Sequence, residues 1–202
     1  MELFSQTVKI NQKGAKTDFT TGDDVHINNA RSFIRERCIA LIKGIKNVID
    51  IHKLIDRDFV FGLLDQCKSK FISEDRIYIY AEAIYEGFNN NFISAAHLLI
   101  PQFENSFRHI ASQNGIETTK WTDNLQHQNI FGGVLEKIKD FTKDDLHKEL
   151  HNFLVDSNTN FRNELCHGLI SPIIIEHYGT YLWWLTLKMV FQTENYFSFS
   201  SQ

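Results

Sequence analysis

The residues of this chain best suited to chemistry are Arg162, Asn163 and His167, which lie close together in the sequence. On a helix, residues four apart share a face, so the Asn163 amide is predicted to reach the His167 ring and fix its tautomer. Arg162 is long enough to curl toward the same pocket. An arginine stabilises charge that develops on phosphate oxygens, and a histidine transfers protons near neutral pH. Together these residue types suit chemistry on a phosphodiester.

The neighbouring residues predict how this site is positioned. Gly168 suits the left-handed position that ends a helix, and Pro172 blocks an early restart of the helix. Upstream, Glu104 and Arg108 stand four positions apart and are expected to share one helix face. If that face packs against the first site, Glu104 is expected to hold Arg162, or Arg108 to add a second cation. Otherwise the two form an ordinary intrahelical ion pair of small value.

The order of Arg162, Asn163 and His167 resembles the signature of HEPN domains (higher eukaryotes and prokaryotes nucleotide-binding). That signature is an arginine, often followed by asparagine, and then a histidine after a short spacer. Residues 160–168 are similar to the motif of one bacterial branch, Asn-x-Arg-Asn-x-x-x-His-Gly. Cys166 is one departure, because the family usually has alanine there; this exchange of small residues is expected to be harmless.

The upstream helix carries a second part of the resemblance. Pro101, Glu104 and Arg108 are similar to the same branch's pattern of leucine, proline, glutamine, glutamate and arginine. The resemblance covers roughly residues 73–190. It implies an all-α fold, an antiparallel bundle of four or five main helices. It also implies that Glu104 and Arg108 line the substrate pocket.

The resemblance further implies a metal-independent RNA endonuclease without a cofactor. Two copies of the chain would place their signature helices face to face as a homodimer. His167 would deprotonate the ribose 2′-hydroxyl or protonate the leaving 5′-oxygen, Arg162 would stabilise the pentacoordinate phosphate, and Asn163 would hold His167. Many members of the superfamily act as toxins, in phage defence or in RNA processing, so an antitoxin or defence-system partner is expected by analogy.

Two alternatives stay open. The first is a non-catalytic HEPN-like module that binds RNA, a nucleotide or a partner protein, and the net charge of −4 favours it slightly. The second is a structural helical subunit of a larger assembly, with the aromatic helix around Trp183 and Trp184 as its contact surface.

The composition fits one helical domain. The chain has 202 residues, 43% of them apolar, with only two prolines and ten glycines. Residues 1–27 are polar and aperiodic and predict a flexible arm, which leaves 28–202 as a single HEPN-like helical domain. Three widely spaced cysteines, and a start without the pattern of a signal peptide, indicate a cytoplasmic protein. No apolar stretch reaches membrane-spanning length.

Hydrophobic periodicity predicts helices separated by polar turns, with no strong strand pattern. Pro101 is expected to kink or divide the helix that contains it. The predicted helices span residues 29–55, 58–70, 74–88, 92–113, 132–140, 143–155, 160–167 and 173–192.

The first of these helices has two notable faces. An apolar series repeats every three or four positions: Ile34, Cys38, Leu41, Ile45, Val48, His52 and Ile55. A polar arc gathers the bases Arg31, Arg35, Lys43, Lys46, Lys53 and Arg57. This arc is interpreted as a solvated helix face, with a contact strip for a phosphate backbone as the alternative.

His147 and His151 share one helix face and are a possible zinc pair. The intervening residues do not match the metalloprotease pattern His-Glu-x-x-His, and no third ligand stands at a suitable spacing. A solvated or partly buried histidine pair is therefore the prediction, and no metal site is assigned.

Overall fold

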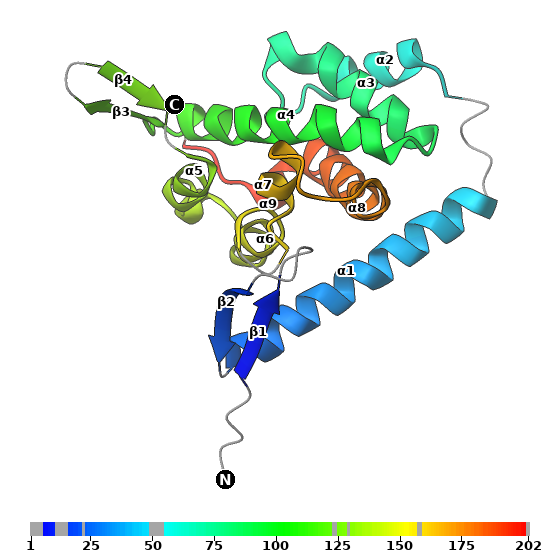
Figure 1. Ribbon diagram of the computed structural model, residues 1–202. Helices are drawn as coiled ribbons and strands as arrows, with labels where there is room; N and C mark the ends of the chain where they lie inside the picture. Colours follow the sequence, from blue (N-terminus) through cyan, green and yellow to red (C-terminus); the bar gives the residue numbers. More distant parts are fainter. Residues whose placement is uncertain are drawn as a thin grey trace.

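The computed structural model describes residues 6–10, 16–21, 23–48, 55–122, 125–128, 130–156 and 159–200. Over these ranges the chain forms the predicted all-α fold, a bundle whose main helices are α1, α2, α3, α4 and α8 (Figure 1). Shorter helices complete one side of the bundle, and two small β-hairpins lie at its edges.

The observed helices follow the predicted ones closely. The α-helices are α1 (Asp23–Val48), α2 (Arg57–Cys67), α3 (Ile77–Phe88), α4 (Phe92–Gln113), α5 (Phe131–Lys137), α6 (Asp144–Leu150), α7 (Phe161–Cys166), α8 (Pro172–Phe191) and α9 (Thr193–Tyr196). Two 3₁₀ turns, Glu74–Arg76 and Lys139–Phe141, precede α3 and follow α5, and a π-helical turn, His151–Val155, continues α6.

The N-terminal region differs from the predicted arm. Strands β1 (Gln6–Ile10) and β2 (Lys16–Thr21) pair antiparallel, and α1 already begins at Asp23. The boundary expected between residues 27 and 28 therefore falls inside a helix. A second antiparallel hairpin joins β3 (Thr119–Thr122) and β4 (Leu125–Gln128), in a stretch where the sequence showed no period.

Helix α4 lies at the centre of the bundle, with α2 and α3 on one side and α8 on the other (Figure 1). Pro101 does not divide this helix, which runs unbroken from Phe92 to Gln113. Its inner face contributes Phe103 and Phe107 to an aromatic cluster around Phe71, with ring centroids 5.9 and 5.6 Å from that ring. A buried aromatic core of this kind gives α4 a fixed orientation, and so fixes where its polar face points.

Two glycines allow the long helices to approach closely. A Cβ on Gly179 would lie 2.6 Å from the backbone oxygen of Phe92, so α8 can cross α4 only because this position has no side chain. Gly87 of α3 leaves room for the ring of Trp183, whose indole Nε1 donates to the Ile84 carbonyl over 3.0 Å. Trp183 is buried inside the bundle and is not part of an exposed aromatic surface.

The apolar series of α1 does not face the core. Ile34, Leu41, Ile45 and Val48 are each more than half exposed. The helix instead buries a neighbouring face that carries Val25, Arg35, Ile39 and Ile42. His52 lies outside the described residues.

The basic arc is divided. Arg31, Arg35 and Lys46 face the bundle, so the interpretation of the whole arc as a solvent-facing strip was wrong, whereas the side chains of Lys43 and Arg57 are 40% and 57% exposed. Arg35 is only 1% exposed, and Lys46 Nζ donates to the Phe88 carbonyl over 2.8 Å beneath the ring of Trp183. Arg31 lies near Asp145 and Glu149, Lys43 near Glu176, and Arg57, on α2, pairs with Glu82. Lys53 lies outside the described residues. Acidic side chains and backbone carbonyls of the other helices bind Arg31, Arg35 and Lys46, so these side chains lie against the bundle.

Candidate functional site

Helix α7 ends in the way the sequence predicted. Gly168 has a φ of +64°, in the left-handed region. Its amide donates to the Leu165 carbonyl over 3.1 Å, and the next amide, of Leu169, donates to the Glu164 carbonyl over 2.9 Å. This pair of bonds is the Schellman motif, which satisfies carbonyls at a helix end. His167 is therefore the last residue before the left-handed turn, and its side chain is exposed.

A buried aromatic side chain anchors the start of α7. Phe161 is buried, stacks on Phe153 at 5.2 Å between ring centroids, and meets Tyr178 of α8 edge-on at 5.8 Å. Asn160, just before the helix, has a φ of +47°. Asparagine tolerates this left-handed conformation better than most residues do. The buried ring and this turn together fix how the helix presents the residues that follow.

The structure brings Arg162 of α7 together with Glu104 of α4. The guanidinium Nε donates to Glu104 Oε1 over 2.6 Å, and Nη2 forms an ion pair with the same oxygen. Arg108, one turn further along α4, places Nη2 at 4.0 Å from Glu104 Oε2. Glu104 thus stands between the two arginines. The expectation that Glu104 holds Arg162 is met, and Arg108 forms with Glu104 the intrahelical ion pair that was the alternative for these two residues.

The Asn163 side chain makes no hydrogen bond to the His167 ring, contrary to the expectation from helical spacing. Its Oδ1 accepts from Arg162 Nη1 over 2.8 Å, and its Nδ2 donates to Asn160 Oδ1 over 2.7 Å. The His167 backbone amide still donates to the Asn163 carbonyl over 3.0 Å, whereas both ends of the Asn163 side-chain amide are already bound by Arg162 and Asn160. Within the described part of the chain, the His167 ring makes no hydrogen bond.

The cluster of Glu104, Arg108, Arg162 and Asn163, with Asn160 behind it, is half-buried. The side chain of Arg162 is 27% exposed. A guanidinium carries five N–H donors. In Arg162, Nε donates to Glu104, Nη1 donates to Asn163, and Nη2 forms an ion pair with Glu104. The remaining donors on Nη1 and Nη2 make no further bond to the described residues. The guanidinium is therefore held in place by a carboxylate and an amide while it keeps capacity for an anionic ligand.

Asn160 is the residue of this cluster to which sequence reasoning gave no role. It supplies the acceptor that orients the Asn163 amide. The available signal was its position three residues before Asn163, immediately ahead of an expected helix, where asparagine is a frequent turn residue.

His147 lies on α6, and His151 begins the π-helical turn that continues it. The rings of His147 and His151 lie 6.4 Å apart between centroids, and His147 is buried. Burial lowers the pKa of His147, although Glu136 at 3.7 Å opposes the shift. Among the described residues, no three His, Cys, Asp or Glu side chains come close enough together to hold a metal ion. None of the described helices is long and apolar enough to cross a membrane.

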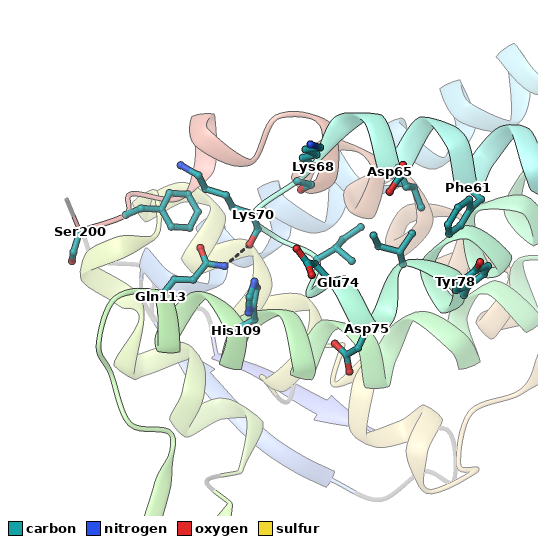
Figure 2. A pocket seen from close by; sticks show the side chains of 15 residues that line it. Phe61, Asp65, Lys68, Lys70, Glu74, Asp75, Tyr78, His109, Gln113 and Ser200 are labelled. Carbon is teal, nitrogen blue, oxygen red and sulfur yellow. Dashed lines mark hydrogen bonds between the residues drawn. The ribbon is translucent and has the colours of Figure 1, made fainter. Parts of the chain in front are cut away.

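A cavity of about 1110 Å³ lies on another face of α4 (Figure 2). His109 and Gln113 of α4 line it together with Lys68 and Lys70 from the turn after α2, and Gln113 Nε2 donates to the Lys70 carbonyl over 3.0 Å. Burial lowers the pKa of His109. At 100° per residue, His109 and Gln113 point well away from Glu104, so this cavity is separate from the arginine cluster.

Comparisons of this chain with protein-family models, with curated proteins and with solved structures found no match.

Proposed function

We propose that this protein is a metal-independent RNA endonuclease of the HEPN type, acting in the cytoplasm. The observation that supports the proposal best is the contact between Arg162 and Glu104. Two helices join there, through residues 58 apart in the sequence, to hold one guanidinium, and an exposed histidine follows five residues later at the end of α7. The same residues carry the resemblance to the HEPN signature, so motif and geometry coincide on one surface.

The proposed reaction uses the RNA's own 2′-hydroxyl as the nucleophile. The 2′-oxygen attacks the adjacent phosphorus while the bond from phosphorus to the 5′-oxygen breaks. His167 accepts the 2′-hydroxyl proton or donates a proton to the leaving 5′-oxygen. The free donors of Arg162 stabilise the negative charge on the phosphate oxygens, and Arg108 adds positive charge nearby. The products are a 2′,3′-cyclic phosphate and a 5′-hydroxyl.

The role proposed for Asn163 changes with the geometry. In place of holding His167, Asn163 orients the guanidinium of Arg162 and is itself oriented by Asn160. A second copy of the chain, placed with its α7 facing this one, would contribute a further arginine and histidine. Such a pair would supply one histidine for each proton transfer.

The test is cleavage of total RNA by the purified protein in excess chelator. Wild type is compared with His167→Ala and Arg162→Ala, with folding followed by circular dichroism. We expect wild type to cut RNA and not DNA, and each substitution to lower the rate by about 10²–10⁴-fold, as is typical for loss of a proton-transfer or charge-stabilising group. Cleavage that survives both substitutions would exclude this site.

A non-catalytic RNA-binding or protein-binding module is the second candidate. It is favoured by the net charge of −4 and by the carboxylate of Glu104, which neutralises part of the arginine charge. In that case the folded wild type would leave RNA intact at every salt concentration, and Arg162→Ala would weaken binding without any effect on cleavage. An antitoxin or defence-system partner would then occupy the surface of α7.

A further inference from the structure

Helix α1 carries an apolar strip that the bundle leaves uncovered. It consists of Ile27, Ile34, Leu41, Ile45 and Val48, and Cys38, in the same row, is partly buried against the core. The five large aliphatic side chains range from 49% to 85% exposed. Phe33, 62% exposed, widens the strip on one side. Single exposed apolar residues are ordinary on a protein surface, but a continuous row of them along a helix marks an interaction site.

The spacing of the strip indicates what covers it. From Ile34 the apolar positions advance by four, three, four and three residues to Val48, and Ile27 precedes Ile34 by seven. This is the a and d pattern of a heptad repeat, with a period of 3.5 residues. A helix that packs on a globular core shows a wider apolar face, whereas a strict a and d row is the narrow seam of a helix pair. The strip therefore fits a second helix.

The bundle packs against a different face of α1. The face of α1 that packs on α8 and the π-helical turn carries Arg35, Ile39 and Ile42. At 100° per residue it lies roughly a third of a turn from the seam. Helix α1 thus has two faces with separate partners, and Figure 1 shows it as a long straight element along the outside of the molecule. Among the described residues, only the face with Arg35, Ile39 and Ile42 is covered by other parts of the chain.

The charges around α1 disfavour a membrane surface as the occupant. A helix that lies on a membrane has lysines and arginines flanking its apolar face. Here Arg31, Arg35 and Lys46 turn toward the bundle, where acidic or carbonyl oxygens bind them. The exposed cation beside the strip is Arg37, whose guanidinium lies over the Phe33 ring at 5.6 Å.

A second copy of α1 is the occupant that matches the strip. The row is aliphatic apart from Cys38 and holds no charged side chain, so an identical row complements it. Ala30, Ala40 and Gly44 are exposed beside it, and such small residues permit a close approach of a second helix. Six large apolar side chains, each about half exposed or more, approach the roughly 800 Å² per partner of a standard protein interface. We propose that two copies of this chain associate through α1, seam against seam.

This contact is a different surface from the α7 pairing of the proposed function and does not depend on nuclease activity. Its test is the mass in solution, by light scattering and sedimentation equilibrium, of wild type, Leu41→Glu and Ile173→Glu. Leu41, 63% exposed, lies in the α1 seam, and Ile173, 75% exposed at the start of α8, is the control. Circular dichroism confirms that each variant is folded.

We expect wild type at twice the chain mass of 23.6 kDa. Leu41→Glu should weaken the dimer by about 100-fold or more, because each charge would be buried against the partner seam. Ile173→Glu should remain dimeric. A wild type that is monomeric at high micromolar concentration overturns the proposal, as does a dimer that survives Leu41→Glu in a chain that also carries Ile173→Glu, where the α7 pairing no longer adds to the mass. Dissociation by Ile173→Glu alone would assign the contact to the α7 side instead.

Discussion

Two arginine clusters of this molecule are built from the same residue types and have opposite surroundings. Arg35 binds Glu149 and Asn152, and Arg162 binds Glu104 and Asn163. We refer to them as the closed cluster and the open cluster. The side chain of the first arginine is 1% exposed, and that of the second is 27% exposed. Residue types alone therefore do not distinguish a structural clamp from a candidate site.

The closed cluster uses nearly all of its arginine's capacity. Nε and Nη2 of Arg35 donate to Glu149 Oε1 over 3.1 and 2.9 Å, Nη2 also donates to Asn152, and Nη1 donates to Thr159 over 3.0 Å. The guanidinium also lies over the ring of Phe153 at 4.7 Å. These bonds use four of the five donors, and the side chain is only 1% exposed, so a ligand has no access to the fifth. In the open cluster, donors on Arg162 remain available at the surface, which makes that cluster the one suited to function.

The largest expected effect is the difference in unfolding free energy lost when the arginine of each cluster is replaced by alanine. Arg35→Ala should lower the free energy of unfolding by about 3–5 kcal/mol, because it removes a fully buried side chain and leaves the largely buried Glu149 carboxylate with only Arg31, at 3.6 Å. Arg162→Ala should lower it by about 1 kcal/mol, since that pair is partly solvated. Urea unfolding followed by circular dichroism measures both. Equal losses in the two variants would show that the clusters do not differ as described.

The next effect is a pH dependence of the closed cluster. Tyr181 donates its hydroxyl to Glu149 Oε1 over 3.1 Å, and burial, with the nearby Glu149 carboxylate, raises the pKa of Tyr181. The folded protein therefore keeps this proton above pH 10, where the unfolded chain loses it. The stability contributed by Tyr181 is present below pH 10 and falls by up to about 1.4 kcal/mol per pH unit above it.

The measurement compares urea unfolding of wild type and Tyr181→Phe between pH 8 and pH 10.5. The stability advantage of wild type should be constant up to about pH 9.5 and shrink above that. Tyr80 and Lys46 also titrate in the alkaline range, but both variants share them, so their contributions cancel. An advantage that stays constant through pH 10.5 would mean that Tyr181 is not held in a buried, anionic environment.

Glu104→Gln tests how far the open cluster depends on its carboxylate. The change keeps the shape of the side chain and removes the charge between Arg108 and Arg162. We expect a stability loss of about 1–1.5 kcal/mol and a fall of about tenfold in RNA cleavage, because the guanidinium is less well positioned. Glu149→Gln is the matched change in the closed cluster and should cost at least twice as much stability. Full activity in Glu104→Gln would remove its proposed positioning role.

The open cluster was largely predictable from sequence, and the closed cluster was not. Local signals placed α4 at its observed bounds, located the turn at Gly168 and suggested the contact of Glu104 with Arg162. The partners of Arg35 are 114 to 124 residues away, and no local pattern indicates them. Periodicity revealed the apolar strip of α1, but it cannot say which of two faces the bundle buries. The contact predicted between the Asn163 amide and the His167 ring failed because helical spacing does not reveal that Arg162 and Asn160 bind that amide first.

The smallest expected effect concerns the turn that presents His167. Gly168 has a φ of +64°, and no atom lies within 4 Å of a Cβ placed there, so Gly168→Ala meets backbone strain and no clash. The strain should cost about 1 kcal/mol. Since the Arg162 contacts lie a turn earlier and are unaffected, any loss of cleavage in this variant reports on the placement of His167. Gly44→Ala, also without a neighbour within 4 Å but on α1, is the matched control and should leave cleavage unchanged. Wild-type cleavage in Gly168→Ala, with stability lowered as expected, would show that proton transfer tolerates movement of the imidazole.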